Sequence, residues 1–237
     1  MSKRFKGLTC AYCATEGAST TGDHVFAREF FPLNKRSNLP KVAACQACNN
    51  DKSKLEHYLT AVLPFGGRHP DASHMLNSMV PPRLAKNVRL HNALSEGQSR
   101  AWINRGGVIL PTMTIPIDAN QFRQLFTLIM KGLMTHHWGV HVPPTHNASA
   151  GLLTEAGEAL LAPMLAGNGR ARATASIGGG AFEYNGLQAL DDPLLSIWCF
   201  RAYGGITLGG DPRENAEATP RIWAMTSRQP LLNIFDE

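Results

Sequence analysis

The sequence lacks the features that mark membrane-spanning and secreted, disulfide-rich proteins. No apolar run in its 237 residues reaches the ~18 residues expected of a membrane span, so we expect no membrane partner. The basic start is not followed by the apolar segment of a secretory signal, which makes the cytoplasm the expected compartment. Charged residues are also few, at 17%, whereas hydrophobic residues make up 43%. This balance argues against wholesale disorder and predicts a packed core.

Cysteine is scarce, and four of the five cysteines lie near the N-terminus. They form two CxxC pairs, Cys10 with Cys13 and Cys45 with Cys48. In a reducing compartment such pairs bind a metal more often than they form disulfides. Four thiolates fill the tetrahedral coordination of Zn²⁺ and leave no open position, so we predict a structural zinc. The fifth, Cys199, lies in an apolar run and is predicted to be a buried core thiol.

Polar residues with catalytic chemistry lie between and just after these pairs. Asp23 and His24 are neighbours in a short strand-like run, and neighbours on a strand point to opposite faces. A neutral imidazole can take a proton from water near pH 7. Asn49 directly follows the last cysteine, at the start of a predicted helix. Carboxylate and amide oxygens are hard ligands that suit Mg²⁺ or Mn²⁺.

Together these features resemble the HNH (ββα-metal) endonuclease family, in its zinc-stapled CxxC…CxxC subgroup. The resemblance covers about residues 8–63, roughly a quarter of the chain. The residues that carry it are Cys10, Cys13, Asp23, His24, Asn38, Cys45, Cys48, Asn49 and Lys52.

The resemblance implies a role for each matching residue. Asp23 and Asn49 would hold a catalytic Mg²⁺ or Mn²⁺, His24 would be the general base, and Asn38 would hold the loop over His24. The implied function is metal-dependent hydrolysis of DNA phosphodiester bonds. Stand-alone proteins of this layout often occur in phage defence or restriction.

The sequence departs from the family pattern in places. Many members carry a second metal-binding histidine one turn after the first helix ligand, where this chain has Ser53. Asn50 and Asp51 are alternative helix ligands, and Asn34 is the alternative to the middle asparagine. His57 lies two turns after the first helix ligand and could reach the site only by a long path.

The expected partner is DNA, with RNA as an alternative. The formal charge of +5 suits an anionic partner. Arg28, Lys52 and Lys54 are the predicted phosphate contacts. The alternative function is a non-catalytic zinc-ribbon module that binds nucleic acid. A homodimer is also compatible with the sequence.

The predicted fold class is α+β. We expect an N-terminal ββα-metal nuclease domain with structural zinc at residues 1–65. An α+β domain for recognition, dimerisation or regulation is expected at residues 66–237. In the first domain we predict strands at 23–26 and 41–44, then a helix from Asn49 to about residue 63.

Hydrophobic periodicity and turn signals give a coarser reading of the second domain. Residues 66–80 and 167–180 are predicted to be connections, with a turn or short hairpin around 106–110. Predicted helices cover residues 83–94, 119–137 and 152–165. Predicted strands cover residues 112–117, 182–184, 196–200, 205–208 and 222–225, the last four in an antiparallel sheet. The histidines near the 119–137 helix are more simply explained as capping a core helix than as a metal cluster: His136, His137, His141 and His146.

Overall fold

The computed structural model describes residues 3–105, 107–206 and 221–229. It combines helices with strands that pair antiparallel, so the predicted α+β class is confirmed. Within these ranges, no helix is both long enough and apolar enough to cross a bilayer.

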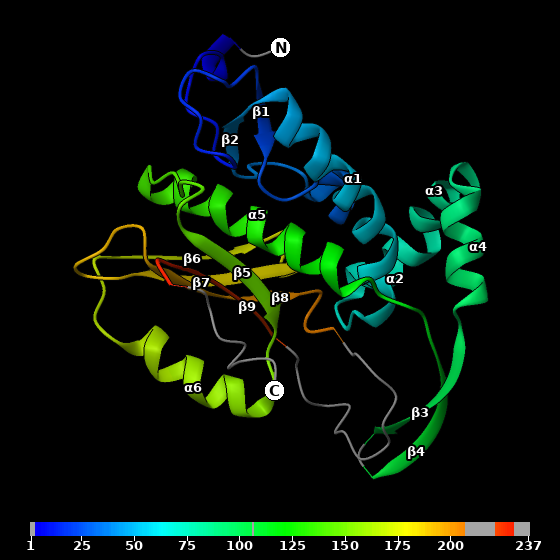
Figure 1. Ribbon diagram of the computed structural model, residues 1–237. Helices are drawn as coiled ribbons and strands as arrows, with labels where there is room; N and C mark the ends of the chain where they lie inside the picture. The colour runs from blue at the N-terminus through cyan, green and yellow to red at the C-terminus, as the bar shows by residue number, and fades with distance from the viewer. Residues whose placement is uncertain (1–2, 106, 207–220, 230–237) are drawn as a thin grey trace.

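The N-terminal segment forms a hairpin followed by a helix (Figure 1). β1 (Thr21–His24) pairs with β2 (Lys41–Ala44), as predicted for residues 41–44, whereas β1 lies two residues before its predicted position. α1 (Gln46–Val62) begins before Asn49 because Cys45 caps it: the Cys45 Sγ accepts a hydrogen bond from the Cys48 N–H. Short 3-10 helices flank these elements: η1 (Lys3–Phe5), η2 (Arg28–Phe30), η3 (Leu33–Lys35) and η4 (Leu63–Gly66).

Residues 66–80 are not the loop that composition predicted. They contain α2 (Pro70–Ser78), which starts with proline in a position where no N–H is needed. His69 caps this helix, since its Nδ1 accepts a hydrogen bond from the Asp71 N–H at 3.1 Å. His69 Nε2 also lies 3.1 Å from the Gly179 carbonyl oxygen, which ties the segment to the C-terminal half.

The helix predicted over residues 83–94 is split in two. α3 (Val80–Lys86) and α4 (Val88–Glu96) meet at Asn87, whose backbone leaves helical geometry. The Asn87 Oδ1 accepts a hydrogen bond from the Leu90 N–H at 3.1 Å and so caps α4.

A two-stranded ribbon follows α4 and extends away from the rest of the molecule (Figure 1). β3 (Ser99–Arg105) pairs with β4 (Val108–Thr114) along their full lengths. The ribbon is longer than the hairpin predicted around 106–110. The strand predicted over 112–117 overlaps only the end of β4.

α5 (Ala119–Trp138) is the predicted 119–137 helix, confirmed almost to the residue. Asp118 caps its start by accepting hydrogen bonds from the Asn120 and Gln121 N–H groups. Gly139 ends it in the left-handed region, at φ 67°, where glycine carries no steric penalty.

The C-terminal half is a five-stranded antiparallel sheet, in the order β5-β9-β8-β7-β6. Its antiparallel character and three of its strands agree with the prediction, but β5 and β6 were not predicted. β6 falls in the expected connection 167–180. The predicted strand 205–208 is replaced at Ile206 by an isolated bridge to Gly67, and its last two residues lie outside the described ranges. The strands are β5 (Asn147–Leu152), β6 (Ala171–Ile177), β7 (Phe182–Gln188), β8 (Ser196–Ala202) and β9 (Ile222–Ser227).

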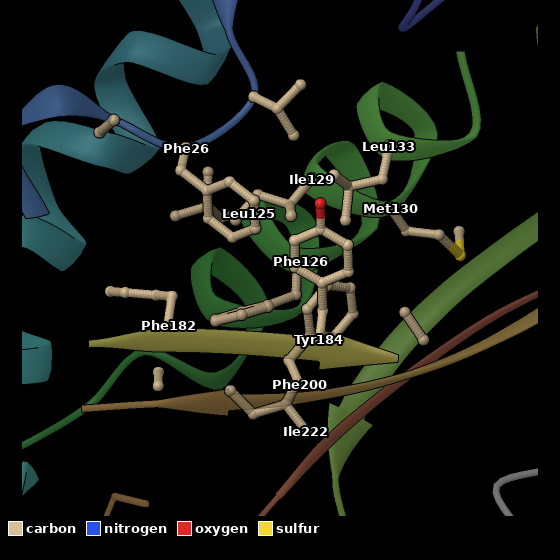
Figure 2. Packing of buried hydrophobic residues seen from close by; sticks show 14 of the residues in the cluster. Phe26, Leu125, Phe126, Ile129, Met130, Leu133, Phe182, Tyr184, Phe200 and Ile222 are labelled. Carbon is tan, nitrogen blue, oxygen red and sulfur yellow. The ribbon is translucent and has the colours of Figure 1, made fainter. Parts of the chain in front are cut away.

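The two faces of this sheet are covered by different helices (Figure 1). α5 lies over one face, and α6 (Glu155–Ala166), close to the predicted 152–165 helix, lies over the other. Figure 2 shows the α5 side, where Phe126 and Ile129 of α5 point toward Tyr184 and Phe200 of the sheet. Phe26, which follows β1, enters the same cluster and packs edge-on against Phe182 at 5.6 Å between ring centroids.

One buried cluster therefore includes residues from both predicted domains. The chain after β1 also approaches α5 closely at Gly132. A Cβ there would lie 3.0 Å from a methyl carbon of Val25, so the glycine makes room for the hairpin. The cysteine-bearing hairpin is thus packed against the helix that covers the sheet.

Candidate functional site

The four N-terminal cysteines converge on one point. The ligand atoms of Cys10, Cys13, Cys45 and Cys48 all lie within 4.8 Å of one another, and the Cys13 and Cys45 sulfurs are 4.0 Å apart. Ala14, at φ 58°, turns the chain sharply after the first pair. The predicted metal cluster is confirmed as a set of residues that could hold a metal such as zinc.

The thiols of this cluster differ in their acidity. Burial raises the pKa of Cys13, but its hydrogen bonds with Thr15, Cys10 and Cys48 together outweigh that effect, and the pKa falls to about 7. Burial raises the pKa of Cys10, and burial together with the neighbouring thiols raises that of Cys48. Because a metal binds thiolates, loading the site must release protons. Four converging thiols fit a Zn²⁺ ion, which they would hold as a structural centre.

α5 brings a positive charge to the first cysteine pair. Lys131 Nζ donates a hydrogen bond to the Tyr12 carbonyl oxygen at 3.4 Å, between the two cysteines. Burial lowers the pKa of Lys131, whereas the nearby thiols of Cys48, Cys13 and Cys10 oppose this. A cation here offsets the negative charge of four thiolates. No sequence spacing pointed to Lys131, because it lies in a distant helix.

Asp23 belongs to a buried ionic cluster behind the hairpin. Its Oδ2 accepts hydrogen bonds from the Tyr12 hydroxyl at 2.5 Å and pairs with the Lys52 ammonium at 3.0 Å. Lys52 also contacts the Glu56 carboxylate and donates to the His24 carbonyl oxygen at 2.8 Å. Three acceptors thus surround an ammonium with three N–H groups.

The Lys52 side chain is 0% exposed. This burial does not agree with its predicted role as a phosphate contact, because its N–H groups are engaged inside the protein. Its observed contacts instead hold Asp23 and the backbone of His24. Tyr12 and Glu56 were not predicted to belong to the site. The only sequence signal for Glu56 was its position one turn after Lys52 on α1.

Glu56 is perturbed by this environment. Burial raises the pKa of its carboxyl, Lys52 opposes the rise, and Asp23 adds to it, with a resulting pKa of about 7. Burial and the neighbouring Asp23 carboxylate raise the pKa of the Tyr12 hydroxyl, which keeps it a hydrogen-bond donor at neutral pH.

His24 ends β1 and is half-buried, opposite Lys41 of β2. Burial lowers the pKa of His24, and the positive charges of Lys41 and Arg28 lower it further. The imidazole is therefore neutral at pH 7. In the part of the chain that the structure describes, its ring makes no hydrogen bond. It lies on the face of β1 opposite to Asp23.

The remaining predicted residues occupy varied positions. Asn49 is half-buried in the first turn of α1. Its alternatives are exposed: Asn50 accepts from Gln46, and Asp51 pairs with Lys54 at 2.8 Å. Ser53, His57, Arg28 and Lys54 are also exposed.

The middle asparagine is exposed and adopts a left-handed turn. Asn38 has φ 58°, a conformation that asparagine tolerates better than most residues. Its turn leads into Pro40, whose carbonyl accepts from the Val25 N–H at 2.8 Å and so closes the connection between the strands. Asn34, the alternative, lies in the exposed part of η3.

The later histidines do not gather around a metal-sized point among the described residues. His137 Nε2 lies 2.9 Å from the Tyr184 hydroxyl, and Trp138 packs on Trp198. These contacts join the end of α5 to the sheet, and the capping role of the histidines stays a prediction. Cys199 is buried, as predicted, and burial raises its pKa to about 11.

Compared with known proteins, the chain matches no family model, no curated protein and no solved structure. Its function therefore has to be argued from its own residues.

Proposed function

We propose that this protein is an HNH-type endonuclease that hydrolyses DNA phosphodiester bonds with His24 as the general base. The observation that carries the proposal is the state of His24. A neutral, half-buried imidazole without an internal hydrogen-bond partner in the described chain lies beside the cationic side chains of Lys41 and Arg28. Such a site can attract a phosphate and accept a proton from water.

The hairpin and helix support the rest of the constellation. Asp23 and Asn49 come from β1 and α1, which follow the order expected of a ββα-metal unit at residues 1–65. Among the described residues, the Asp23 Oδ1 and the side-chain amide of Asn49 make no hydrogen bond. These hard oxygens fit Mg²⁺ or Mn²⁺ as the ligands of a catalytic ion. When bound, such an ion would stabilise charge on the phosphate and the leaving oxygen.

The chain's own residues supply the remaining steps. Lys52 fixes the His24 backbone and one oxygen of Asp23, so the two side chains keep their opposite orientations. His24 takes the proton of the attacking water. Arg28 and Lys54 are exposed and can contact DNA phosphates. We place the activity in the cytoplasm, in phage defence or restriction, with RNA as the alternative substrate.

A second candidate is a non-catalytic zinc module that binds nucleic acid. One observation favours it: the Asp23 carboxylate already pairs with a buried ammonium, which is a structural role. In such a module, His24 would have no catalytic role and would simply lie near the cationic side chains of Lys41 and Arg28.

A cleavage assay separates the two functions. Supercoiled plasmid is incubated with the protein and Mg²⁺, Mn²⁺ or EDTA, and nicking is compared with DNA binding in a gel-shift assay. We expect cleavage with the divalent ions, and a loss of at least ~100-fold in His24→Ala with DNA binding retained. His57→Ala, an exposed histidine on α1, is the matched control. Cleavage by His24→Ala at the wild-type rate would reject the general-base role.

A further inference from the structure

The ribbon of β3 and β4 exposes apolar side chains that the rest of the described chain does not cover. Trp102, Ile109 and Met113 are 52%, 56% and 55% exposed. Neither buried cluster includes a residue of the ribbon, and neither strand pairs with another strand in the described residues. Isolated two-stranded ribbons are marginally stable in water, so pairing with a further strand would stabilise this one.

Apolar side chains are exposed on both faces of the ribbon: Trp102, Ile109 and Met113 share one face, and Val108 and Leu110 lie on the other. Trp102 pairs with Pro111, Arg100 with Met113, and Asn104 with Ile109, and alternate residues of a strand share a face. The Trp102 face therefore carries Trp102, Pro111, Met113 and Ile109 at its centre and along β4, with Arg100 and Asn104 at the two ends of its β3 side. The ribbon has no acidic residue. Such an apolar face suits protein–protein contact better than the base edges of a DNA groove, which are read by hydrogen bonds.

The two edges of the ribbon differ in their capacity to pair. Arg105 and Val108 flank a two-residue loop, so this pair exchanges backbone hydrogen bonds and every second pair along the ladder does the same. The Trp102–Pro111 pair falls between them, and the Pro111 nitrogen therefore faces outward. The outer edge of β4 lacks a donor at its centre and is protected from pairing. β3 has no proline, and its edge is complete.

We propose that the β3 edge pairs with the β3 edge of a second copy of this chain, which makes a four-stranded sheet across a two-fold axis at Trp102. An antiparallel pairing centred there is the register that aligns the whole of Ser99–Arg105. It places Arg100 opposite the second copy's Asn104, so the two Arg100 side chains do not face each other. The two Trp102 side chains lie on the same face as a cross-strand aromatic pair. This inference does not depend on the proposed nuclease activity.

The test is the mass of the full-length, zinc-loaded protein across a concentration series by light scattering and sedimentation. We expect the mass to rise from 25.8 kDa toward twice that value. Arg100→Pro removes an outward N–H from β3, and Met113→Pro removes one from β4 at the same cross-strand pair. Neither change touches the β3–β4 ladder, and circular dichroism checks the fold.

The expected result is a monomer for Arg100→Pro and a dimer for Met113→Pro. Trp102→Lys, which places two ammonium groups at the axis, should also be monomeric. A wild-type chain that stays monomeric throughout the series overturns the proposal. So does a dimer that survives Arg100→Pro, or one that is lost equally in both proline variants.

Discussion

The hairpin–helix unit around the cysteines and the sheet around α5 bury different kinds of polar group. The unit buries the charge of Lys52 against two carboxylates. The sheet buries neutral hydroxyls: Ser196 and Thr226 lie 2.9 Å apart, and the Ser196 oxygen accepts from the Trp198 indole N–H at 3.1 Å. Around this pair the sheet core is apolar and rich in aromatic rings.

The two kinds of buried polar group differ in what they contribute to the free energy of folding. Neutral hydroxyls need only a hydrogen-bond partner, whereas a buried ion pair costs desolvation energy that its attraction repays only with good geometry. An apolar replacement would often stabilise such a site equally well. Under the proposed function, the charged cluster positions Asp23 and the backbone of His24 and adds little net stability.

The largest expected difference between the two regions follows the loss of the four-cysteine cluster, which belongs to the hairpin–helix unit alone. Cys45→Ser removes one of the four clustered thiols but keeps a side chain that can cap α1. We therefore expect zinc to be lost and the hairpin–helix unit to unfold because of the lost ligand alone. Binding energy of structural zinc is folding energy, on the order of 10 kcal/mol. Zinc content and limited proteolysis within residues 8–63 measure the effect.

Cys199→Ser is the matched control, because this thiol is buried in β8 and does not belong to the four-cysteine cluster. It should keep its zinc and lose about 1–2 kcal/mol by burying a hydroxyl. Equal zinc content in both variants would show that the four-cysteine cluster is not the metal site.

Residues close in sequence were predictable, whereas residues that meet through the fold were not. The CxxC spacing located the metal cluster, and the period of α5 located that helix. Asn87 splits a predicted helix because its side chain caps the start of α4, and this single hydrogen bond competes with the helix propensity of the surrounding residues. β6 is rich in small residues and reads as a connection, yet pairing with β7 makes it a strand. The burial of Lys52 and the approach of Lys131 depend on tertiary packing, which a single sequence does not display.

Lys52→Met tests the energetic contribution of the buried ionic cluster in the hairpin–helix unit. It leaves Asp23 and Glu56 buried without their cation, so we expect a loss of about 3–5 kcal/mol in the free energy of unfolding. Lys54→Met removes an exposed lysine paired with Asp51 on the same helix and should cost less than ~1 kcal/mol. Denaturant titration gives both values, and similar losses in the two variants would refute the buried ionic cluster.

The smallest effect is a pH dependence that the sheet should not share. The pKa of Glu56 is about 7 in the folded state, above its ordinary value of 4.5, because burial favours the neutral acid. Between these values the folded protein binds more protons than the unfolded chain, so stability falls as pH rises. The contribution of Glu56 is complete below pH 4.5 and is lost as pH passes 7, by about 3 kcal/mol at most. Glu56→Gln cannot titrate, so the difference in unfolding free energy between variant and wild type should change across this window. A difference that stays constant from pH 4.5 to 7 would show that Glu56 is ionised throughout, fully compensated by Lys52.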